Sequence, residues 1–418
     1  MSARVYLESL GCRLNAAEIE SLARQFAGAG FEVTADPARA DLIVLNSCAV
    51  TAQAARKSRH RLRALHRESP SADLAVTGCW ATEDVARAGS LAGVQWVVPN
   101  VAKAETVAEI TGTAPTPAPW APGRWGHTRA FLGVQDGCDH ACTYCVTRIL
   151  RGRARSRPLH DTVMTVQELV DQGAQEVVLT GVSLGSYGQD LSLDRGLSQL
   201  ITAILSDTDL PRLRLSSVEP WDVDGDLLQL WQDPRLCRQL HLPLQSGSDA
   251  VLRRMGRGIT ASHFRDLVQT ARAVSPDIAI TTDVIAGFPG ESDDDFAQTF
   301  AFVEEIGFAR LHVFPYSERA GTAAVRLKAR VPKEVRKVRA RQLRALGRRL
   351  AAAYRARFVG QTLNVLWERG GAQGAWAGWS DNYISVKTWD PRDLYNRITS
   401  TRITEVDGDV LTGEVPVA

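Results

Sequence analysis

The stretch GCDHACTYC at residues 137–145 places Cys138, Cys142 and Cys145 in a C-x3-C-x2-C pattern. Three thiolates on one short loop can hold three irons of a cubane iron–sulfur cluster and leave its fourth iron open to a small molecule. The alternatives are a zinc site and a redox thiol pair. A structural zinc site usually needs a fourth ligand at short spacing, and His140 inside the loop is poorly placed for that role. The spacing therefore favours an iron–sulfur cluster.

Strand and helix patterns alternate on both sides of this loop. Because such alternation is typical of parallel sheets covered by helices, we expect a partial (β/α)6 barrel, with its chemistry on loops at the carboxyl ends of the strands. We place this domain at 126–358 and end it with a basic helix at 333–358. The six expected strands are 131–135, 176–180, 212–216, 239–243, 279–283 and 311–315.

The flanking regions predict two further domains. Residues 1–113 also alternate between strand and helix, which predicts an open parallel α/β sheet domain. Proline recurs in APTPAPWAPG at 114–123, so 114–125 is expected to be a linker. Residues 359–418 switch to short strand patterns separated by Gly, Asp and Asn, which predicts a small closed β-barrel. The fold class is therefore α/β multidomain.

Three further cysteines, Cys12, Cys48 and Cys79, each follow a predicted strand of the first domain. In a parallel sheet such strand ends share one edge, so the three thiols are expected to converge. A buried, inert cysteine is common for any one of them. Three at equivalent strand ends favour a second three-thiolate cluster with an open iron. Cys237 is expected to be structural.

The two cysteine groups in this order, followed by a β-domain, resemble the radical S-adenosylmethionine methylthiotransferase family. The resemblance covers nearly the whole chain and implies a methylthiotransferase domain, a radical S-adenosylmethionine barrel and a TRAM domain. It also implies two [4Fe–4S] clusters and S-adenosyl-L-methionine, which the barrel cluster cleaves to a 5′-deoxyadenosyl radical. Supporting motifs are LTGVSLGSYG (179–188), RLSSVEP (214–220), HLPLQSGSD (241–249), DVIAGFPGE (283–291) and HVFPYSERAGTAA (312–324).

Family members act on isopentenyl-type adenosine or threonylcarbamoyladenosine in tRNA, or on an aspartate of a ribosomal protein. In NSCAVTAQAARKSR (46–59), the Val-Thr after Cys48 and the later Lys-Ser-Arg resemble the threonylcarbamoyladenosine branch. The resemblance thus implies methylthiolation at C2 of N6-threonylcarbamoyladenosine beside the anticodon, with two S-adenosylmethionine molecules. The other two substrates and a non-catalytic iron–sulfur RNA-binding protein are the alternatives. The sequence departs from the family at Val146–Thr147–Arg148, where Pro-Tyr is frequent.

Residues at the ends of the barrel strands are candidates for binding the cofactor. Glycines there permit close approach of a ligand to the backbone, and polar side chains can hydrogen-bond it. An ordinary turn or a satisfied polar group at the rim is the competing interpretation, and no catalytic residue is singled out. The candidates are Gly181, Ser183, Glu219, His241, Gln245, Gly287 and Gly290.

Local basic clusters predict contact with nucleic acid, although the formal net charge of the 418 residues is only +2. Lys and Arg crowd 56–67, 148–157 and 333–349, a pattern suited to the phosphates of a tRNA anticodon stem-loop. A solvated basic helix face is the alternative. The aromatic residues of the last domain can stack on bases or fill its core; they are Trp367, Trp376, Trp379 and Tyr383.

The chain shows no signal peptide and no apolar run of membrane-spanning length. A cytoplasmic protein with reduced cysteines is therefore expected. It contains neither a P-loop nor an H-E-x-x-H motif, so nucleotide hydrolase and zinc protease functions have no motif to support them. The resemblance implies an electron donor such as flavodoxin or ferredoxin. The sequence makes no prediction of oligomeric state.

Overall fold

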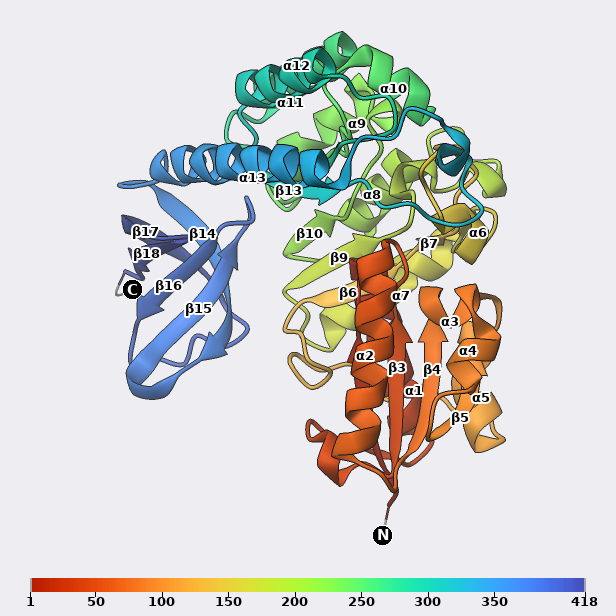
Figure 1. Ribbon diagram of the computed structural model, residues 1–418. Helices are drawn as coiled ribbons and strands as arrows, with labels where there is room; N and C mark the ends of the chain where they lie inside the picture. The colour runs from red at the N-terminus through yellow and green to blue at the C-terminus, as the bar shows by residue number, and fades with distance from the viewer. Residues whose placement is uncertain (1, 417–418) are drawn as a thin grey trace.

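Five parallel strands in the order β2-β1-β3-β4-β5 form the first sheet of the computed structural model, which describes residues 2–416 (Figure 1). The strands are β1 (Arg4–Ser9), β2 (Glu32–Val33), β3 (Leu42–Ser47), β4 (Asp73–Gly78) and β5 (Val94–Val98). The helices are α1 (Arg13–Gly28), α2 (Ala52–Glu68), α3 (Cys79–Glu83), α4 (Val85–Gly89) and α5 (Thr106–Thr111).

The central strand β3 shows why this sheet needs helices on both faces. Ile43 and Leu45 pack on the side of α2, whereas Leu42 and Val44 pack on the side of α1. All six residues of β3 are buried. A strand buried on both faces reads as a continuous apolar run, as the sequence does here. The predicted open parallel α/β sheet is confirmed.

Six more parallel strands form the predicted partial barrel. They make two three-stranded sheets, β10-β9-β6 and β11-β12-β13, which isolated bridges join at Leu213–Leu236 and Ser217–His241. The strands are β6 (Ala130–Gly133), β9 (Glu176–Thr180), β10 (Arg212–Leu215), β11 (Gln239–His241), β12 (Ala279–Ala286) and β13 (Arg310–Pro315). A short antiparallel pair, β7 (Gln135–Asp136) and β8 (Arg155–Ser156), lies beside them.

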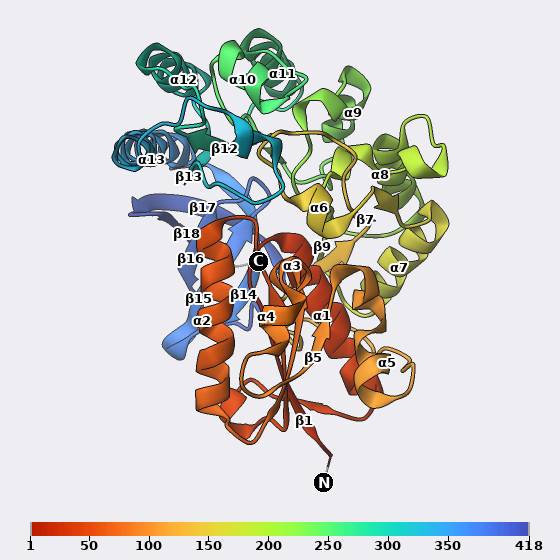
Figure 2. The ribbon, with the colours of Figure 1, turned by 45° about the vertical axis from the view of Figure 1, so that its right-hand side comes forward.

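Helices follow one another around the outside of these strands (Figure 2). They are α6 (Thr147–Arg151), α7 (Leu159–Asp171), α8 (Gly196–Asp207), α9 (Gly225–Gln229), α10 (Asp249–Met255), α11 (Ala261–Val274), α12 (Asp293–Ile306) and α13 (Lys333–Ala356). Leu213, Leu240 and Val284 point outward into the apolar core beneath the helices. Because neighbouring residues of a strand point to opposite faces, the inner face carries the polar residues between them, including Arg214 and Asp283.

The C-terminal residues form a closed five-stranded barrel in the order β14-β15-β16-β18-β17. Its strands are β14 (Thr362–Gly370), β15 (Ala375–Ser380), β16 (Ser385–Trp389), β17 (Ile398–Asp407) and β18 (Val410–Glu414). The predicted closed β-barrel is confirmed. The sequence of β15, AWAGWS, lacks the usual β-branched residues and contains glycine, so local propensity does not predict it as a strand. A turn separates β15 from β16.

That turn, residues 380–383, lies against the amino ends of the large barrel's strands. Arg214 donates hydrogen bonds to the backbone oxygens of Ser380 (3.1 Å) and Asp381 (3.0 Å) and to Glu176 Oε1 (2.6 Å). The guanidinium groups of Arg214 and of Arg13, from α1, each lie 4.9 Å from the centre of the Tyr383 ring. All three parts of the chain therefore meet at Tyr383.

The proline-rich segment before β6 packs along α1. Arg24 Nε donates to the backbone oxygen of Ala118 (2.8 Å), and the buried Trp120 donates from Nε1 to Glu20 Oε1 (2.5 Å). Trp120 also belongs to the apolar core of the large barrel. The segment thus fastens the first sheet to the barrel. Among the described residues, no helix is long and apolar enough to cross a membrane.

The Glu20 carboxyl lies buried in this junction. Burial raises its pKa from the usual 4.5 to about 8, against the hydrogen bond from Trp120 and the charge of Arg24, which both lower it. His127 Nδ1 lies 4.0 Å from Glu20 Oε2. At neutral pH the folded protein therefore keeps a proton on Glu20 that the unfolded chain loses.

We expect Glu20→Gln to stabilise the protein by an amount that grows with pH. Stability that comes from the protonated carboxyl is complete at low pH and is lost as the pH rises from about 4.5 towards about 8, because the unfolded chain loses its proton first. Glutamine keeps an oxygen that accepts from Trp120. One pKa unit corresponds to about 1.4 kcal/mol, so the thermal midpoint of the variant should exceed that of the wild type by several degrees near the upper end of this range.

Thermal unfolding across the same pH range checks this expectation. Glu109→Gln, at an exposed position of α5, is the matched control and should show no such pH dependence. A difference between Glu20→Gln and the wild type that stays constant with pH would contradict the assignment.

Candidate metal centres

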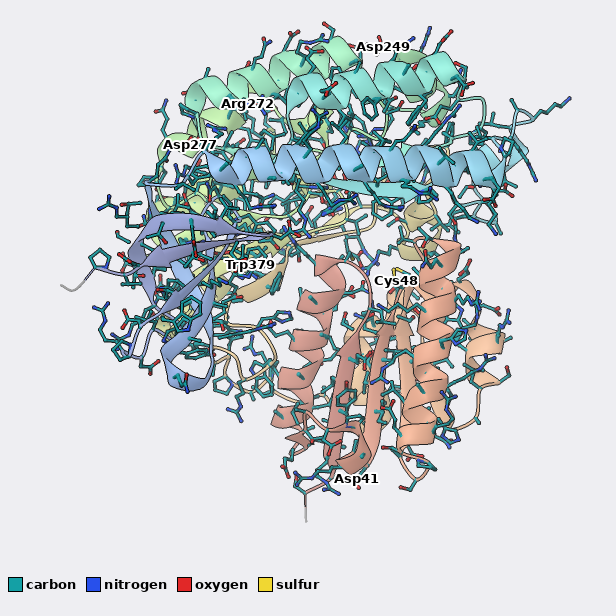
Figure 3. The ribbon with its side chains drawn as sticks, turned by 60° about the vertical axis from the view of Figure 1, so that its left-hand side comes forward. Asp41, Cys48, Asp249, Arg272, Asp277 and Trp379 are labelled. Atoms are coloured by element: carbon teal, nitrogen blue, oxygen red, sulfur yellow. The ribbon has the colours of Figure 1, made fainter. Side chains whose placement is uncertain are left out.

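Cys12, Cys48 and Cys79 lie together at the carboxyl edge of the first sheet. Cys12 directly precedes α1, Cys48 follows β3, and Cys79 is the first residue of α3. Ser9 pairs with Asn46 and Ser47 pairs with Gly78 at the ends of three adjacent parallel strands, so the cysteines that follow these strands are neighbours. Figure 3 shows Cys48 at the edge of this sheet that faces the barrel. The expected convergence of these three thiols is therefore present.

The backbone leaves little room around this group of thiols. Gly11 has φ of +114°, and a Cβ atom there would lie 2.9 Å from Cys48 Sγ. A side chain at position 11 is therefore disfavoured by both the backbone conformation and the contact. The glycine that precedes Cys12 allows the first strand end to approach the second.

The donor set suits a metal cluster. Burial raises the pKa of Cys48 to about 11. The Cys12 thiol lies 3.4 Å from Asn15 Oδ1, and Asn100 Nδ2 lies 3.7 Å from Cys79 Sγ. Cysteines bind metals as thiolates, so iron would replace the thiol protons. Three converging thiols with polar amides beside them fit a three-thiolate cluster.

The second group, Cys138, Cys142 and Cys145, lies on the loop after β7. The Cys145 N–H donates to the Cys142 oxygen (3.1 Å), and the Cys138 N–H donates to the Gly152 oxygen (3.1 Å). Burial raises the pKa of Cys142 to about 11 and also raises that of Cys138. The loop thus folds its three thiols towards one another.

His140 of this loop is engaged elsewhere. Its Nε2 accepts a hydrogen bond from Trp221 Nε1 (3.3 Å), and the two rings meet edge to face with centroids 5.0 Å apart. All three thiols of the loop are free. A set of three thiols without a histidine fits the iron–sulfur interpretation better than a four-ligand zinc site.

Three of the candidate cofactor residues lie close to this loop. The Ser183 N–H donates to Gln135 Oε1 (2.9 Å), and the Gln135 amide donates to the backbone oxygen of Gly137, next to Cys138 (2.8 Å). Glu219 forms an ion pair with Arg257 (2.8 Å). The charge of Arg257 lowers the pKa of the Cys142 thiol, whereas the charge of Glu219 raises it. The Gly181 N–H points at Ser216 Oγ (3.4 Å).

The other candidates have different surroundings. Gln245 adopts φ of +69°, and its N–H donates to the backbone oxygen of Asp283 (2.8 Å). A Cβ on Gly287 would lie 2.2 Å from Arg336 Cγ, and one on Gly290 would lie 3.1 Å from Arg254 Nε. Side chains of the protein thus fill the space beside both glycines. Cofactor binding by these residues stays a prediction.

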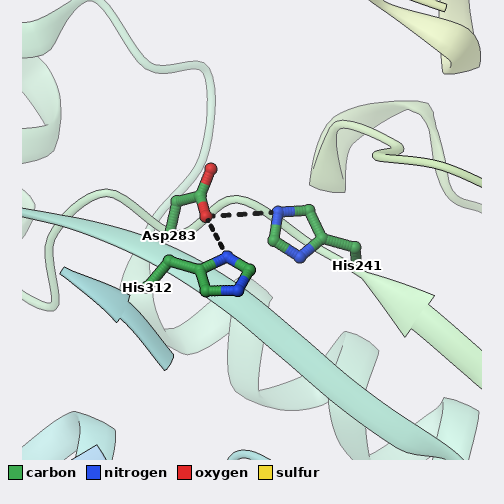
Figure 4. A group of neighbouring side chains, drawn as sticks. All are labelled: His241, Asp283 and His312. Carbon is green, nitrogen blue, oxygen red and sulfur yellow. Dashed lines mark hydrogen bonds and ion pairs between the residues drawn. The ribbon is translucent and has the colours of Figure 1, made fainter. Parts of the chain in front are cut away.

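His241 lies on the inner face of the barrel, beside Asp283. Its Nε2 is 3.4 Å from Asp283 Oδ1, and the same oxygen lies 3.0 Å from His312 Nδ1 (Figure 4). Sequence reasoning identified His241 but not its two partners. Only the pairing of Asp283 with His312 in the sheet reveals them.

Arg151 connects the surroundings of the two thiol groups. It is 2% exposed and donates to Glu18 Oε1, Asp136 Oδ1 and Asn15 Oδ1, each at 2.8 Å. Burial alone would raise the pKa of Glu18, but the charges of Lys103 and Arg151 lower it to about 2. The expectation that Arg151 belongs to an RNA-binding cluster is wrong, because its guanidinium faces α1 rather than solvent.

Other basic residues are available at the surface. Arg56, Lys57, Arg63 and Arg67 of α2 are exposed, and so are Arg341, Arg344 and Arg348 of α13. Arg339, which was grouped with them, is buried and pairs with Glu291 (2.6 Å) and Asp293 (2.7 Å). The basic surface is therefore smaller than the sequence indicates.

Two family models match the chain: Uncharacterized protein family UPF0004 over residues 4–98, and Radical SAM superfamily over residues 132–303. The threonylcarbamoyladenosine tRNA methylthiotransferase MtaB of Bacillus subtilis is 32% identical, over 96% of this chain and 94% of its own. The tRNA-2-methylthio-N(6)-dimethylallyladenosine synthase of Chloroflexus aurantiacus is 35% identical, over 96% of this chain and 89% of its own.

A solved structure shows a similar fold. The radical S-adenosylmethionine methyltransferase TsrM from Kitasatospora setae superposes with a TM-score of 0.54 at 16% identity, covering 75% of each chain. At this identity the similarity concerns the fold alone.

We expect Arg151→Ala to lower the free energy of unfolding by about 3–5 kcal/mol, because it leaves buried carboxylates without their partner. Urea unfolding measures the change. Arg153→Ala is the matched control: the Arg153 side chain is 89% exposed, and its loss should change stability by less than about 0.5 kcal/mol. Equal effects of the two substitutions would show that Arg151 does not hold the junction together.

Proposed function

Because the chain belongs to the radical S-adenosylmethionine methylthiotransferase family, we propose that it adds a methylthio group to C2 of N6-threonylcarbamoyladenosine beside the anticodon of tRNA. The convergence of two three-thiol groups at the facing ends of two parallel sheets carries this proposal. The similarity to MtaB and the residues after Cys48 support the threonylcarbamoyl substrate.

We assign one [4Fe–4S] cluster to each group of thiols. Cys138, Cys142 and Cys145 would hold the cluster that the radical S-adenosylmethionine match implies. The other three ligands, Cys12, Cys48 and Cys79, would hold the second cluster. When bound, the clusters and two S-adenosylmethionine molecules supply the radical that activates C2, the sulfur and the methyl group. An electron donor such as flavodoxin or ferredoxin would provide the reducing electrons.

The protein's own residues position these groups. The Glu219–Arg257 pair and the Ser183 hydroxyl border the barrel thiols, where they can hydrogen-bond S-adenosylmethionine. Gly181, His241, Gln245, Gly287 and Gly290 remain candidates for the same role. Arg151 holds the two thiol groups at a fixed separation because its partners come from both sides of the junction.

The substrate RNA would lie across the remaining exposed basic residues. Those of α2 and α13 suit phosphate contacts with an anticodon stem-loop. The division at 1–113, 114–125, 126–358 and 359–418 assigns RNA binding to the last part, as in a TRAM domain. Trp367 is buried in that barrel's core, so it is unavailable for stacking on bases. A cytoplasmic location fits a tRNA substrate.

Isopentenyladenosine in tRNA is the second candidate substrate, because a dimethylallyladenosine synthase is as similar to this chain as the threonylcarbamoyladenosine enzymes are. A ribosomal-protein aspartate has no comparable support. Membership of an enzyme family sets the non-catalytic interpretation aside.

We expect anaerobic reconstitution to yield about eight irons per chain, and about four in a triple Ala variant of either thiol group. Cys237→Ala is the control and should keep all of the iron, because Cys237 is buried beside Glu176, away from both groups. About four irons, lost only when the barrel thiols are removed, would contradict the second cluster.

Nucleoside analysis of tRNA tests the substrate. In cells that lack their own methylthiotransferases, the wild type should produce 2-methylthio-N6-threonylcarbamoyladenosine, and both triple variants should produce none. The 2-methylthio derivative of isopentenyladenosine alone would favour the second candidate. The absence of both products, with both clusters present, would reject the tRNA function.

A further inference from the structure

Three polar side chains from adjacent strands meet inside the barrel, and the function proposed above leaves their joint role open. His241 pairs with Thr281, and Asp283 pairs with His312, in the registers of β11, β12 and β13. Thr281 and Asp283 lie two residues apart and therefore share a face. Leu240, Ile280 and Val313 point the other way, into the core beneath the helices. His241, Asp283 and His312 thus line the inner face.

The hydrogen bonds among these residues leave one histidine ring nitrogen available to a ligand. Asp283 Oδ1 accepts a hydrogen bond from His312 Nδ1 (3.0 Å) and lies 3.4 Å from His241 Nε2. His241 Nδ1 then accepts from the Thr281 hydroxyl (2.9 Å), so both of its ring nitrogens are engaged. The His312 side chain is 42% exposed, against 9% for His241. The nitrogen presented to a ligand is therefore His312 Nε2.

The carboxylate at the centre of this chain is firmly ionised. Burial alone would raise the pKa of Asp283, but the hydrogen bonds from the two histidines hold it well below its usual range. When His312 donates its Nδ1–H to Asp283, its Nε2 accepts a hydrogen bond from a hydroxyl if the ring is neutral, and donates one to an anionic oxygen if the ring is protonated. His312 Nε2 is thus able to bind either a hydroxyl or a carboxylate.

A second cationic group lies on the same face of β13. Arg310 precedes His312 by two residues and pairs with Thr281. It is exposed, and its side chain makes no hydrogen bond or ion pair with any residue between 2 and 416. Arg310 and Thr281 line a cavity of about 460 Å³ between β13, α13 and the C-terminal barrel, together with Arg344 and Tyr383. An acidic group that enters here meets the Arg310 guanidinium, and His312 lies two residues further along the same face of β13.

The two candidate tRNA substrates differ in the chemistry of their N6 substituents. The threonylcarbamoyl substituent carries a free carboxylate and a hydroxyl, whereas the isopentenyl substituent is a hydrocarbon. A carboxylate can accept charge-assisted hydrogen bonds from His312 and Arg310. A hydrocarbon packed here would remove water from Asp283 and His312 without replacing their hydrogen bonds.

We propose that His312 and Arg310 bind the carboxylate of the N6 substituent and thereby select threonylcarbamoyladenosine over isopentenyladenosine. This inference rests on the proposed tRNA function. Asp283 and His241 act as positioning residues, because they orient His312 without touching the substrate. A divalent metal ion is the competing occupant, since the three ligand atoms lie within 4.8 Å of one another.

Binding of short anticodon stem-loops to the full-length reconstituted protein, without reductant, tests the proposal separately from catalysis. Three RNAs are compared: one with threonylcarbamoyladenosine, one with isopentenyladenosine and one with plain adenosine. The wild type should bind the first about tenfold or more tightly than the third, the effect of one charge-assisted hydrogen bond. His312→Leu and Arg310→Met should each lose most of this preference and keep the affinity for plain RNA.

Two further variants separate positioning from folding. His312→Gln, which retains a donor, should recover part of the preference. Asp283→Asn should weaken binding of the threonylcarbamoyl RNA without changing that of the other two, a selectivity that a general folding defect would not produce. His263→Leu, at an exposed position of α11, is the matched control and should behave as the wild type. Iron content and thermal midpoint confirm that each variant is folded.

The outcomes distinguish the inference from the proposed function. If the wild type methylthiolates threonylcarbamoyl tRNA but His312→Leu keeps the full binding preference, the inference is wrong and the function stands. If the wild type modifies neither tRNA, the function itself fails. Stoichiometric binding of Zn²⁺ to the wild type, lost in His312→Leu while the RNA preference remains, would assign the cluster to a metal and overturn the inference.

Discussion

The buried guanidinium of Arg151 is the contact on which the arrangement of the two thiol groups depends. It lies a few residues after the barrel thiols and reaches Asn15 and Glu18, a few residues after Cys12. Asn100 reinforces the contact, since its amide donates to the Leu150 oxygen (2.9 Å) and faces Cys79. A buried network of charge-assisted hydrogen bonds of this kind makes the junction rigid. The two candidate cluster sites therefore belong to one framework rather than to two tethered domains.

Much of the fold follows from local sequence patterns. The strand expected at 176–180 is observed with the same bounds, because its apolar run is short and clearly delimited. The gathering of Cys12, Cys48 and Cys79 was predictable, since parallel strands end at the same edge of a sheet. That prediction needed only the order of strands and helices, which the sequence carries in its periodicity.

Features that depend on contacts between distant segments were not predictable. The Asp283–His312 pair exists only in the register of β12 with β13, and no local pattern specifies it. Arg151 and Arg339 have the composition of a basic surface, yet both are buried by carboxylates from other elements. A Cβ atom on Gly287 or Gly290 would meet an arginine side chain from α13 or α10, a contact that no local pattern indicates.

The contact of three parts of the chain at Tyr383 affects how the enzyme would position its substrate RNA. Arg13, Arg129 and Arg214 surround this ring, and the C-terminal barrel is anchored through it to both other parts. The C-terminal barrel is thus held in a fixed position rather than joined to the rest by a flexible linker. RNA bound by the C-terminal barrel would present its nucleotides to the interior of the large barrel at a fixed distance. Because the C-terminal barrel is already held in place, no conformational entropy would be lost in ordering it.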